Sequence, residues 1–384
     1  SFKRIILMIV FYLSKVVPKN RLFSTTIHTP SIFINSFFKL RLFPIPVIER
    51  KSYIAPSVNL VMREKLYKIG QAQIDKCDVD DQLWKIVCAT IPLCYLEGFL
   101  KLLESSKQYG RPTNIVLSHD FHSCDSYKVW VANSVENGTK LIGAQHGGGF
   151  GTVFYEYSEG HEIKVSDLFL SWSNLDRSNS IQVPSQKFIQ KKDNSDNFSI
   201  VMVNVALPSF YKYHSSPIME QFLQNIDDQL LFLSLLKDRP ISHMRIRQYN
   251  GSCDFPIQKK YAISGFDVLV DNDSSYITLI SNANLVVHSY TGTSWLETIM
   301  NNIPTVVFVN PSHWDYQSEV LPYLDQLRTV GIMHDSPSSA ADHVNNIYSN
   351  IDSWWSDEHL QFVRSEFCKR FAYTEKNWEK KWIN

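Results

Sequence analysis

The side chains best suited to chemistry lie in one short stretch, Gln145-His146-Gly147-Gly148-Gly149-Phe150-Gly151. It follows the apolar run Lys140–Ile142, which is typical of a buried strand. Glycine has no Cβ, so the backbone there can adopt positive φ and approach a ligand closely. A polar loop at the carboxyl end of a strand is a common substrate site in α/β enzymes. We therefore predict substrate binding here; the alternative is a tight turn that happens to contain a histidine.

A second polar loop, residues 118–125, joins a predicted strand over 114–117 to a predicted helix over 126–136. It gathers two carboxylates and two imidazoles within seven residues: His119, Asp120, His122 and Asp125. Such groups can act as nucleophile, general base or proton shuttle in glycosyl transfer. The two loops follow consecutive strands of a βαβ pattern, so we expect them to be neighbours. Ordinary roles remain open, because Asp125 could cap the helix and Asp120 could serve the turn.

Glu97 lies within the apolar helical stretch Tyr95–Phe99. A carboxylate on an apolar face is costly unless it is paired or functional. The alternative is an exposed position at the edge of the helix.

A third stretch, His288-Ser289-Tyr290-Thr291-Gly292-Thr293-Ser294-Trp295-Leu296-Glu297, runs from a strand through hydroxyl groups and a glycine into a helix. Amide groups at a helix N-terminus, the helix dipole and nearby hydroxyls form a phosphate site. Glu297, one turn into the helix, could hold ribose hydroxyls. The alternative is a capping box, in which Thr293 or Ser294 is the N-cap and Glu297 completes the motif.

Arg245 and Arg247 alternate on a predicted strand and therefore share one face. A pair of arginines on one face binds an anion or pairs with carboxylates. The predicted phosphate site favours ligand contact for at least one of them.

These segments belong to two predicted parallel α/β domains. The first covers residues 1–186 and carries the catalytic and acceptor side; the second covers 198–350 and binds the nucleotide. A charged, aperiodic linker over 186–197 separates them, and helices over 351–384 are placed to cross back to the first domain. Two Rossmann-like halves without a dinucleotide or Walker fingerprint suggest a sugar-nucleotide transferase.

Composition narrows the classes of function. Lys and Arg number 38 and Asp and Glu number 38 in 384 residues, so a basic field for nucleic acid is not indicated. The six cysteines have no zinc spacing and suit reduced thiols in the cytoplasm. The first 50 residues are basic and aromatic, and their apolar run is too short to span a membrane. They indicate either a packed helical layer or a peripheral contact with an anionic membrane at its inner face.

Five segments of the sequence resemble those of a known family. The segments that carry the resemblance are Ile91–Glu97, Asp125–Ala132, Gln145–Gly151, Glu162–Trp172 and, less specifically, His288–Thr305. Together they resemble a family of bacterial transferases from surface-polysaccharide gene clusters, related to the retaining β-Kdo glycosyltransferases. The resemblance covers most of the chain, and the Gln-His-Gly-Gly segment with its downstream Ser-Asp is its most specific part.

The resemblance implies a GT-B-like fold with the active site in the cleft between two domains. It also implies a CMP-activated ulosonic acid donor, a surface glycan acceptor that could be lipid-linked, and retention through a covalent sugar–aspartate intermediate. Asp125 best matches the nucleophile, with Asp120 in reserve, and Glu97 is the candidate acid/base. His146 is a further candidate catalytic residue, and with the N–H groups of Gly147, Gly148 and Gly149 it would hold the sugar carboxylate or the leaving phosphate. The other implied substrate-binding residues are His119, Gln145, Arg245 and Arg247, with one of the two arginines against a negative group. The nucleotide would contact His288, Ser289, Thr291, Gly292, Thr293, Ser294 and Glu297.

Neither a metal nor another cofactor is expected, because Asp271-Asn272-Asp273 has the spacing of a DxD motif but resembles a surface loop. Two alternatives stay open. One is a GT-B transferase that uses a UDP-sugar, a GDP-sugar or a CDP-polyol donor. The other is a carbohydrate-binding protein without catalytic activity.

Overall fold

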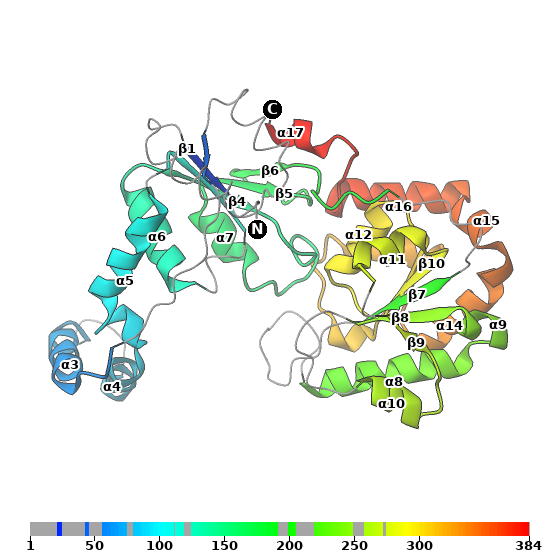
Figure 1. Cartoon of the computed structure of the whole chain (residues 1–384), viewed down its shortest axis with the longest axis horizontal. Helices are drawn as coiled ribbons and strands as arrows, with labels where there is room; N and C mark the ends of the chain where they lie inside the picture. The colour runs from blue at the N-terminus through cyan, green and yellow to red at the C-terminus, as the bar shows by residue number, and fades with distance from the viewer. Residues whose placement is uncertain are drawn as a thin grey trace. The chain divides into compact units, whose positions relative to one another are not determined.

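The computed structural model describes most of the chain. The described residues are 21–24, 43–45, 56–74, 80–110, 112–118, 124–190, 199–204, 219–248, 257–271 and 274–383. The chain divides into two compact units between Ala144 and Gln145, and each unit is presented by itself. Figure 1 gives the labels of the helices and strands.

The first unit contains parallel strands in the order β2-β1-β3-β4. They are β1 (Arg21–Ser24), β2 (Phe43–Ile45), β3 (Asn114–Leu117) and β4 (Lys140–Ala144). Alternation along β3 directs Ile115 and Leu117 to one face. There they join the buried rings of Tyr127 and Trp130, which belong to α6 (Asp125–Glu136).

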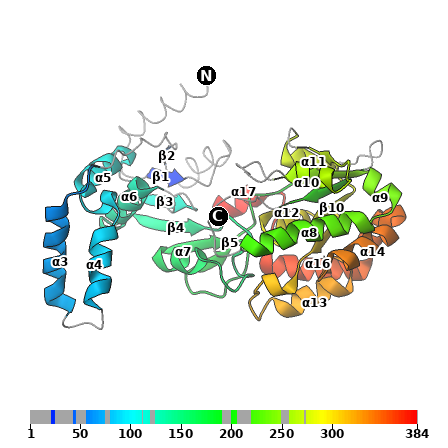
Figure 2. The same ribbon diagram turned by 90° about the horizontal axis from the view of Figure 1, so that it is seen from below.

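The remaining helices of this unit precede β3. They are α3 (Leu60–Ile74), α4 (Asp81–Thr90) and α5 (Phe99–Ser106), with 3-10 turns over Leu93–Tyr95 and Lys107–Tyr109. Helices α3 and α4 lie side by side as a hairpin (Figure 2), and the Trp84 ring occupies the space that a Cβ on Gly70 would need. Helix α4 ends at Thr90, and Ile91 is extended because the ring of the following Pro92 disfavours the helical conformation there.

The second unit contains a six-stranded parallel sheet in the order β12-β11-β10-β7-β8-β9, and β5 pairs in parallel with β6. The strands are β5 (Leu168–Ser171), β6 (Ser180–Gln182), β7 (Ile200–Val203), β8 (Met244–Arg247), β9 (Leu269–Val270), β10 (Leu285–His288), β11 (Thr305–Phe308) and β12 (Met333–His334).

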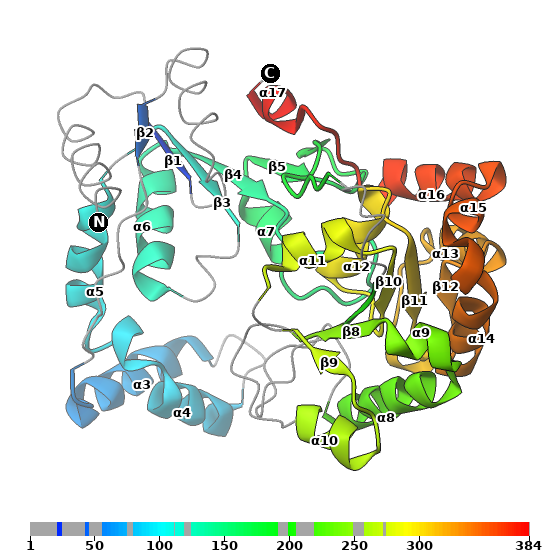
Figure 3. The same ribbon diagram turned by 45° about the vertical axis from the view of Figure 1, so that its right-hand side comes forward.

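Helices cover both faces of the six-stranded sheet, as its apolar strands require (Figure 3). The bounds are α7 (Glu159–Val165), α8 (Met219–Leu235), α9 (Asp238–Ser242), α10 (Ile257–Ile263), α11 (Tyr276–Asn282), α12 (Thr293–Met300), α13 (Leu321–Thr329) and α14 (Pro337–Ile347), with 3-10 turns over Pro311–His313 and Tyr348–Asn350. Along β7, Ile200 and Met202 pack toward α8 and α14, whereas Val201 and Val203 pack toward α11.

Three helices end the chain: α15 (Ile351–Trp355), α16 (Glu358–Phe371) and α17 (Trp378–Ile383). Phe367 and Phe371 of α16 pack in the core beside α12 and α13. The segment after α16 is tied to residues 173–185, because Ser185 donates its N–H to the carbonyl of Tyr373 and Trp382 Nε1 donates to the carbonyl of Pro184.

The expectation of a GT-B-like α/β protein with two parallel sheets is confirmed by these strand pairings. Several short strands were not predicted, namely β1, β2, β6 and β12. Two of them, β1 and β2, lie in the stretch for which a helical layer or a membrane surface was expected. The rest of that stretch, residues 1–20, 25–42 and 46–55, lies outside the described residues.

Candidate functional site

The glycine loop of the second unit begins at a buried amide. Gln145 is 3% exposed. Its Oε1 accepts hydrogen bonds from Ser171 Oγ at 2.7 Å and from the Trp172 N–H at 2.8 Å, while its Nε2 donates to the carbonyl of Gly147 at 2.8 Å. The amide therefore holds the loop against the end of β5. Gln145 was predicted to contact substrate, and in the structure its polar atoms are used to shape the loop.

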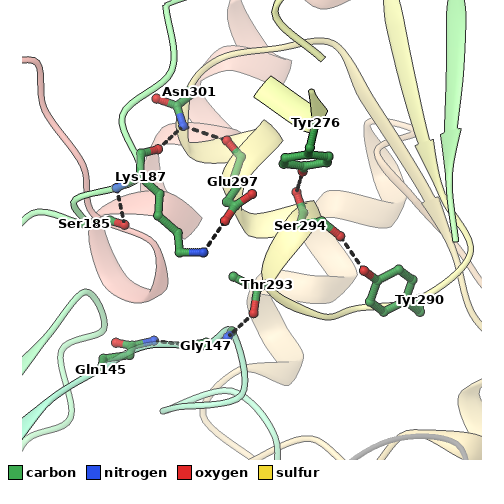
Figure 4. Close-up of polar contacts among 11 residues, drawn as sticks. Gln145, Gly147, Ser185, Lys187, Tyr276, Tyr290, Thr293, Ser294, Glu297 and Asn301 are labelled. Atoms are coloured by element: carbon green, nitrogen blue, oxygen red, sulfur yellow. Dashed lines mark hydrogen bonds and ion pairs between the residues drawn. The ribbon is translucent and has the colours of Figure 1, made fainter. Parts of the chain in front are cut away.

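The loop meets the N-terminus of α12 at Gly148. The Gly148 N–H donates to Thr293 Oγ1 at 3.1 Å, within the cluster of polar contacts drawn in Figure 4. A Cβ at position 148 would lie 2.9 Å from the backbone of Gly292 and of Thr293. Only glycine allows this approach without displacing the helix. The glycine loop and the stretch from His288 to Glu297 are thus in direct contact.

The helix that receives the loop has no side-chain cap. Its N-cap residue is Gly292, in extended backbone conformation. A Ser or Asp at this position would satisfy the amides of the first turn, and a glycine leaves them for another acceptor. The capping box considered from the sequence is therefore absent. An N-terminus with unsatisfied amides and a positive dipole favours an anion.

Tyrosines hold two of the nearby hydroxyl groups. Thr291 Oγ1 is 2.7 Å from Tyr316 Oη, and Ser294 Oγ is 2.6 Å from Tyr290 Oη. Thr291 and Ser294 are buried, whereas Thr293 is half-buried and shares its hydroxyl with the glycine loop. Among the hydroxyl residues predicted here, Thr293 is therefore the one best placed for a ligand.

Glu297 forms an ion pair with Lys187. Lys187 Nζ lies 2.5 Å from Glu297 Oε1, and the side chains point toward one another in Figure 4. The lysine backbone is also attached to α12, because Asn301 Nδ2 donates to the carbonyl of Lys187 and Asn301 Oδ1 accepts the N–H of Ile189. Lys187 was assigned to the linker and missed as a site residue. A lone lysine in a polar segment carries no periodic signal that would have identified it.

His288 and Ser289, at the end of β10, lie inside the unit rather than at its surface. Both are fully buried. Nε2 of His288 is 3.0 Å from Thr298 Oγ1, and burial lowers the pKa of His288 to about 3, so the ring is neutral at ordinary pH. Asn225 Nδ2 donates to the carbonyl of Ser289 at 2.6 Å. These two predicted nucleotide contacts stabilise the strand end on which the loop is built.

Three glutamates at intervals of three residues surround the glycine loop from the segment that follows it. The carboxyl group of Glu156 occupies the place of a Cβ on Gly149, and Glu159 Oε2 accepts the N–H of Gly151 at 2.8 Å. Glu162 Oε2 lies 3.9 Å from His146 Nδ1. Burial raises the pKa values of Glu156 and Glu159. Sequence reasoning missed this group, although its Glu-x-x-Glu-x-x-Glu spacing directly after the glycine loop was a usable signal.

The first unit contains the other predicted acids. Asp125 is the first residue of α6, and its N-cap is Cys124, so Asp125 does not cap the helix. Its Oδ1 accepts a 2.6 Å hydrogen bond from Tyr95 Oη and lies 3.2 Å from Lys128 Nζ. These contacts, Tyr95 first, lower the pKa of Asp125 and keep a 42% exposed carboxylate charged. His119 and Asp120 lie outside the described residues.

Glu97 is paired with a buried arginine. Its Oε1 accepts from Arg63 Nε at 2.7 Å and from the N–H of Asn59 at 3.0 Å, and its Oε2 accepts from Arg63 Nη2 at 3.0 Å. The Arg63 hydrogen bonds lower the pKa of Glu97 to about 2. The costly carboxylate inferred from the sequence is thus compensated, which favours a structural role for it.

The two arginines of β8 converge on one aspartate of the second unit. Arg245 Nη1 is 3.8 Å from Asp271 Oδ2, and the buried Arg247 donates from Nη1 to the Asp271 carbonyl at 3.1 Å. Arg245 thus follows the carboxylate-pairing alternative left open by the sequence, whereas Arg247 contacts a main-chain carbonyl. Within the described residues no group of three His, Cys, Asp or Glu side chains could hold a metal ion. No described helix is both long enough and apolar enough to cross a bilayer.

A family model for the LIC12162 family transferases matches residues 1–384. Curated proteins give no match. Among solved structures, the chain is similar to S. aureus MnaA with UDP (TM-score 0.49, 8% identity, 96% of this chain and 95% of that chain). It is also similar to Acinetobacter baumannii MurG (0.45, 10%, 95% and 98%) and to the wall teichoic acid polymerase TagF (0.36, 11%, 73% and 82%).

Proposed function

The chain belongs to the LIC12162 family of transferases, and we propose that it is a glycosyltransferase that binds the phosphate of a nucleotide-activated sugar at the N-terminus of α12. The observation that carries this proposal is the hydrogen bond from Gly148 to Thr293. It brings the backbone of the glycine loop to an uncapped helix N-terminus, so that two sets of amide groups and one hydroxyl lie together.

This arrangement suits a leaving phosphate. Negative charge grows on the phosphate oxygens as the bond to the sugar breaks, and fixed N–H dipoles stabilise it without reorganising. Lys187 adds a positive charge close to the same helix, held by Glu297 at its first turns. A donor phosphate can compete with Glu297 for this lysine, which would release the carboxylate toward the ribose hydroxyls.

For the donor we propose a CMP-activated ulosonic acid, with retention of configuration through a covalent intermediate on Asp125. The sequence resemblance is the basis for this choice. The state of Asp125 supports it, since a nucleophilic carboxylate must be ionised and accessible. Tyr95 and Lys128 meet the first requirement and partial exposure meets the second.

The test is a thermal shift with CMP, CDP, UDP and GDP at matched concentrations. A ligand at 100 times its Kd stabilises the native state by about 2.7 kcal/mol, which is readily measured. We expect CMP to give the largest shift and Thr293→Val to reduce it, whereas Thr329→Val, on the exposed end of α13, should leave it unchanged.

Preference for another nucleotide would replace the proposed donor and weaken the Asp125 assignment. If CMP is preferred, intact mass after incubation with donor should show a sugar adduct that Asp125→Asn abolishes. A protein that no nucleotide stabilises would contradict the proposed function and favour a binding protein.

A further inference from the structure

A buried chain of polar side chains runs from the end of β7 to the end of β10. Asn204, the residue after β7, donates from Nδ2 to Tyr261 Oη at 2.7 Å, and the hydroxyl of Tyr261 donates to Gln229 Oε1. Gln229 Nε2 donates to Asn225 Oδ1 at 2.7 Å and to Ser289 Oγ at 3.2 Å. Asn225 Nδ2 donates to the main-chain carbonyl of Ser289 at 2.6 Å. All of these residues are buried.

The direction of every hydrogen bond in this chain is fixed by its last member. A main-chain carbonyl can only accept, so Asn225 presents its NH2 group to Ser289 and its oxygen to Gln229. Gln229 must then present its own NH2 group to Asn225, which leaves its oxygen for the hydroxyl of Tyr261. The tyrosine oxygen is left to accept from Asn204. Reversing any one amide would place two acceptors or two donors against each other and break the chain.

The other end of the chain carries a cost. Asn204 Oδ1 is buried and has no hydrogen-bond partner among the described residues. A buried acceptor without a donor destabilises the fold, and apolar side chains of similar shape would avoid that cost. Burial raises the pKa of Tyr261, so its hydroxyl keeps the proton that the chain requires. Stability alone therefore does not account for the chain, and the structure that it holds at Ser289 indicates its role.

The two ends of the chain lie on neighbouring strands at the centre of the sheet. The register pairs Val203 with His288, so Asn204 and Ser289 directly follow a matched pair. From β7 the chain continues to β8 and β9 on one side of the sheet, and from β10 to β11 and β12 on the other. Open parallel sheets bind ligands at the carboxyl ends of the two strands where the order reverses in this way. Ser289 also begins the short turn that ends at Gly292, the N-cap of α12.

We propose that Asn225 and Gln229 of α8 are positioning residues for the phosphate site, which hold the turn from Ser289 to Gly292 in the conformation that receives the donor phosphate. This inference rests on the proposed function. Asn225 fixes the main-chain carbonyl of Ser289, and Gln229 fixes both the amide of Asn225 and the hydroxyl of Ser289. A turn held in this way keeps the amide dipoles of α12 aligned, so they need not reorganise when the phosphate binds.

The first experiment uses pH to break the chain. In Gln229→Glu, a protonated carboxyl still accepts from Tyr261 and donates to Asn225, whereas an ionised one can only accept. Burial raises the pKa of such a carboxyl, so it is protonated at about pH 5 and loses its proton as the pH rises. Gln229→Met keeps a side chain of similar length but removes these hydrogen bonds at every pH. The affinity for CMP is measured by calorimetry at about pH 5 and about pH 8.

Each variant is compared with the wild type at the same pH, which cancels the titration of the CMP phosphate itself. We expect Gln229→Met to bind CMP about tenfold or more weakly than the wild type at both pH values. Gln229→Glu should bind close to the wild type at the lower pH and lose affinity as the pH rises. The proposal would be overturned if Gln229→Met bound as tightly as the wild type, or if Gln229→Glu bound no better than Gln229→Met at the lower pH.

A second comparison separates positioning from a general loss of stability. Gln229→Met should also destabilise the fold, because it leaves polar atoms of Tyr261 and Asn225 unpaired. Val344→Ala removes apolar contacts from the core cluster that contains Tyr261, and urea unfolding measures the loss of stability in each variant. We expect Val344→Ala to keep the CMP affinity of the wild type. An equal loss of affinity in Val344→Ala would show that a loosened core is sufficient, and would overturn the proposal.

Two controls complete the experiment. Gln224→Met and Gln224→Glu make the same changes at an exposed position of α8 and should leave CMP affinity unchanged at both pH values. A wild type that binds no nucleotide contradicts the proposed function. A wild type that binds CMP, together with a Gln229→Met variant that binds it equally well, contradicts only the positioning role of α8.

Discussion

Lys187 and Glu297 form an ion pair across 110 residues of sequence, with Nζ 2.5 Å from Oε1. The carboxylate is 9% exposed and the lysine side chain 39% exposed, so one member of the pair is buried and the other reaches solvent. The pair joins the segment after β6 to the helix that we assign to phosphate binding. It therefore contributes to the stability of the second unit and adjoins the proposed phosphate site.

Replacing Lys187 by methionine should destabilise the protein. The substitution keeps an apolar stem but leaves the carboxylate of Glu297 buried without its cation. Breaking a fully buried pair costs about 3–5 kcal/mol, and the exposure of this lysine reduces our expectation to about 1–2 kcal/mol. Urea unfolding of the variant and the wild type measures this loss of stability. Lys369→Met is the matched control, because Lys369 pairs with Glu366 at the same 2.5 Å but is 69% exposed. Equal losses for the two variants would contradict the buried role of Glu297.

Gly148→Ala should weaken nucleotide binding as well as stability. The new Cβ would stand 2.9 Å from the backbone of Gly292 and Thr293, so the loop must withdraw from α12 and lose its hydrogen bond. We expect a cost of about 1–3 kcal/mol in stability and a clearly smaller thermal shift with CMP. Gly160→Ala is the control, since nothing lies within 4 Å of its added Cβ and alanine favours the helix by about 0.5–1 kcal/mol. Unchanged CMP binding by Gly148→Ala would show that the glycine loop is not part of the nucleotide site.

Gln145→Met should cost about 2–4 kcal/mol of stability, measured by urea unfolding. The methionine fills a similar space but leaves Ser171 Oγ, the N–H of Trp172 and the carbonyl of Gly147 without their buried partner. Gln326→Met, at an exposed position of α13, should change stability by no more than about 0.5 kcal/mol. A small effect at Gln145 would mean that the loop is held by other contacts.

Because of Glu97, the free energy of unfolding should depend on pH below about pH 5. Its pKa in the folded protein is lowered to about 2 by Arg63, below its value in the unfolded chain. A lowered pKa means that the contribution is complete above the unfolded value of about 4.3 and is lost as pH falls toward 2. The urea midpoint of the wild type should therefore fall between pH 5 and pH 2.5 more steeply than that of Glu97→Gln. Parallel curves would show that the carboxylate is not paired in solution.

Much of the architecture follows from local pattern. The apolar runs Leu285–His288 and Thr305–Phe308 can be buried on both faces only in a covered parallel sheet, and they are strands β10 and β11. Strands as short as Met333–His334 cannot be predicted from an apolar run. Two residues carry no periodicity, and they form a strand because Val307 and Phe308 of β11 are aligned beside them.

In the candidate site, too, some features can be predicted from the sequence and others depend on the tertiary structure. Residue types and spacing by themselves determined that the glycine loop and the stretch from His288 to Glu297 each suited a ligand, because strand ends, glycines and hydroxyls are visible in sequence. Only the tertiary structure decided that Gly148 meets Thr293 across 145 residues, that Glu297 pairs with Lys187, and that Glu162 stands beside His146. The reason is physical: backbone preference acts over a few residues, whereas the partner of a buried charge or an uncapped amide is set by which chain segments the packed core brings together.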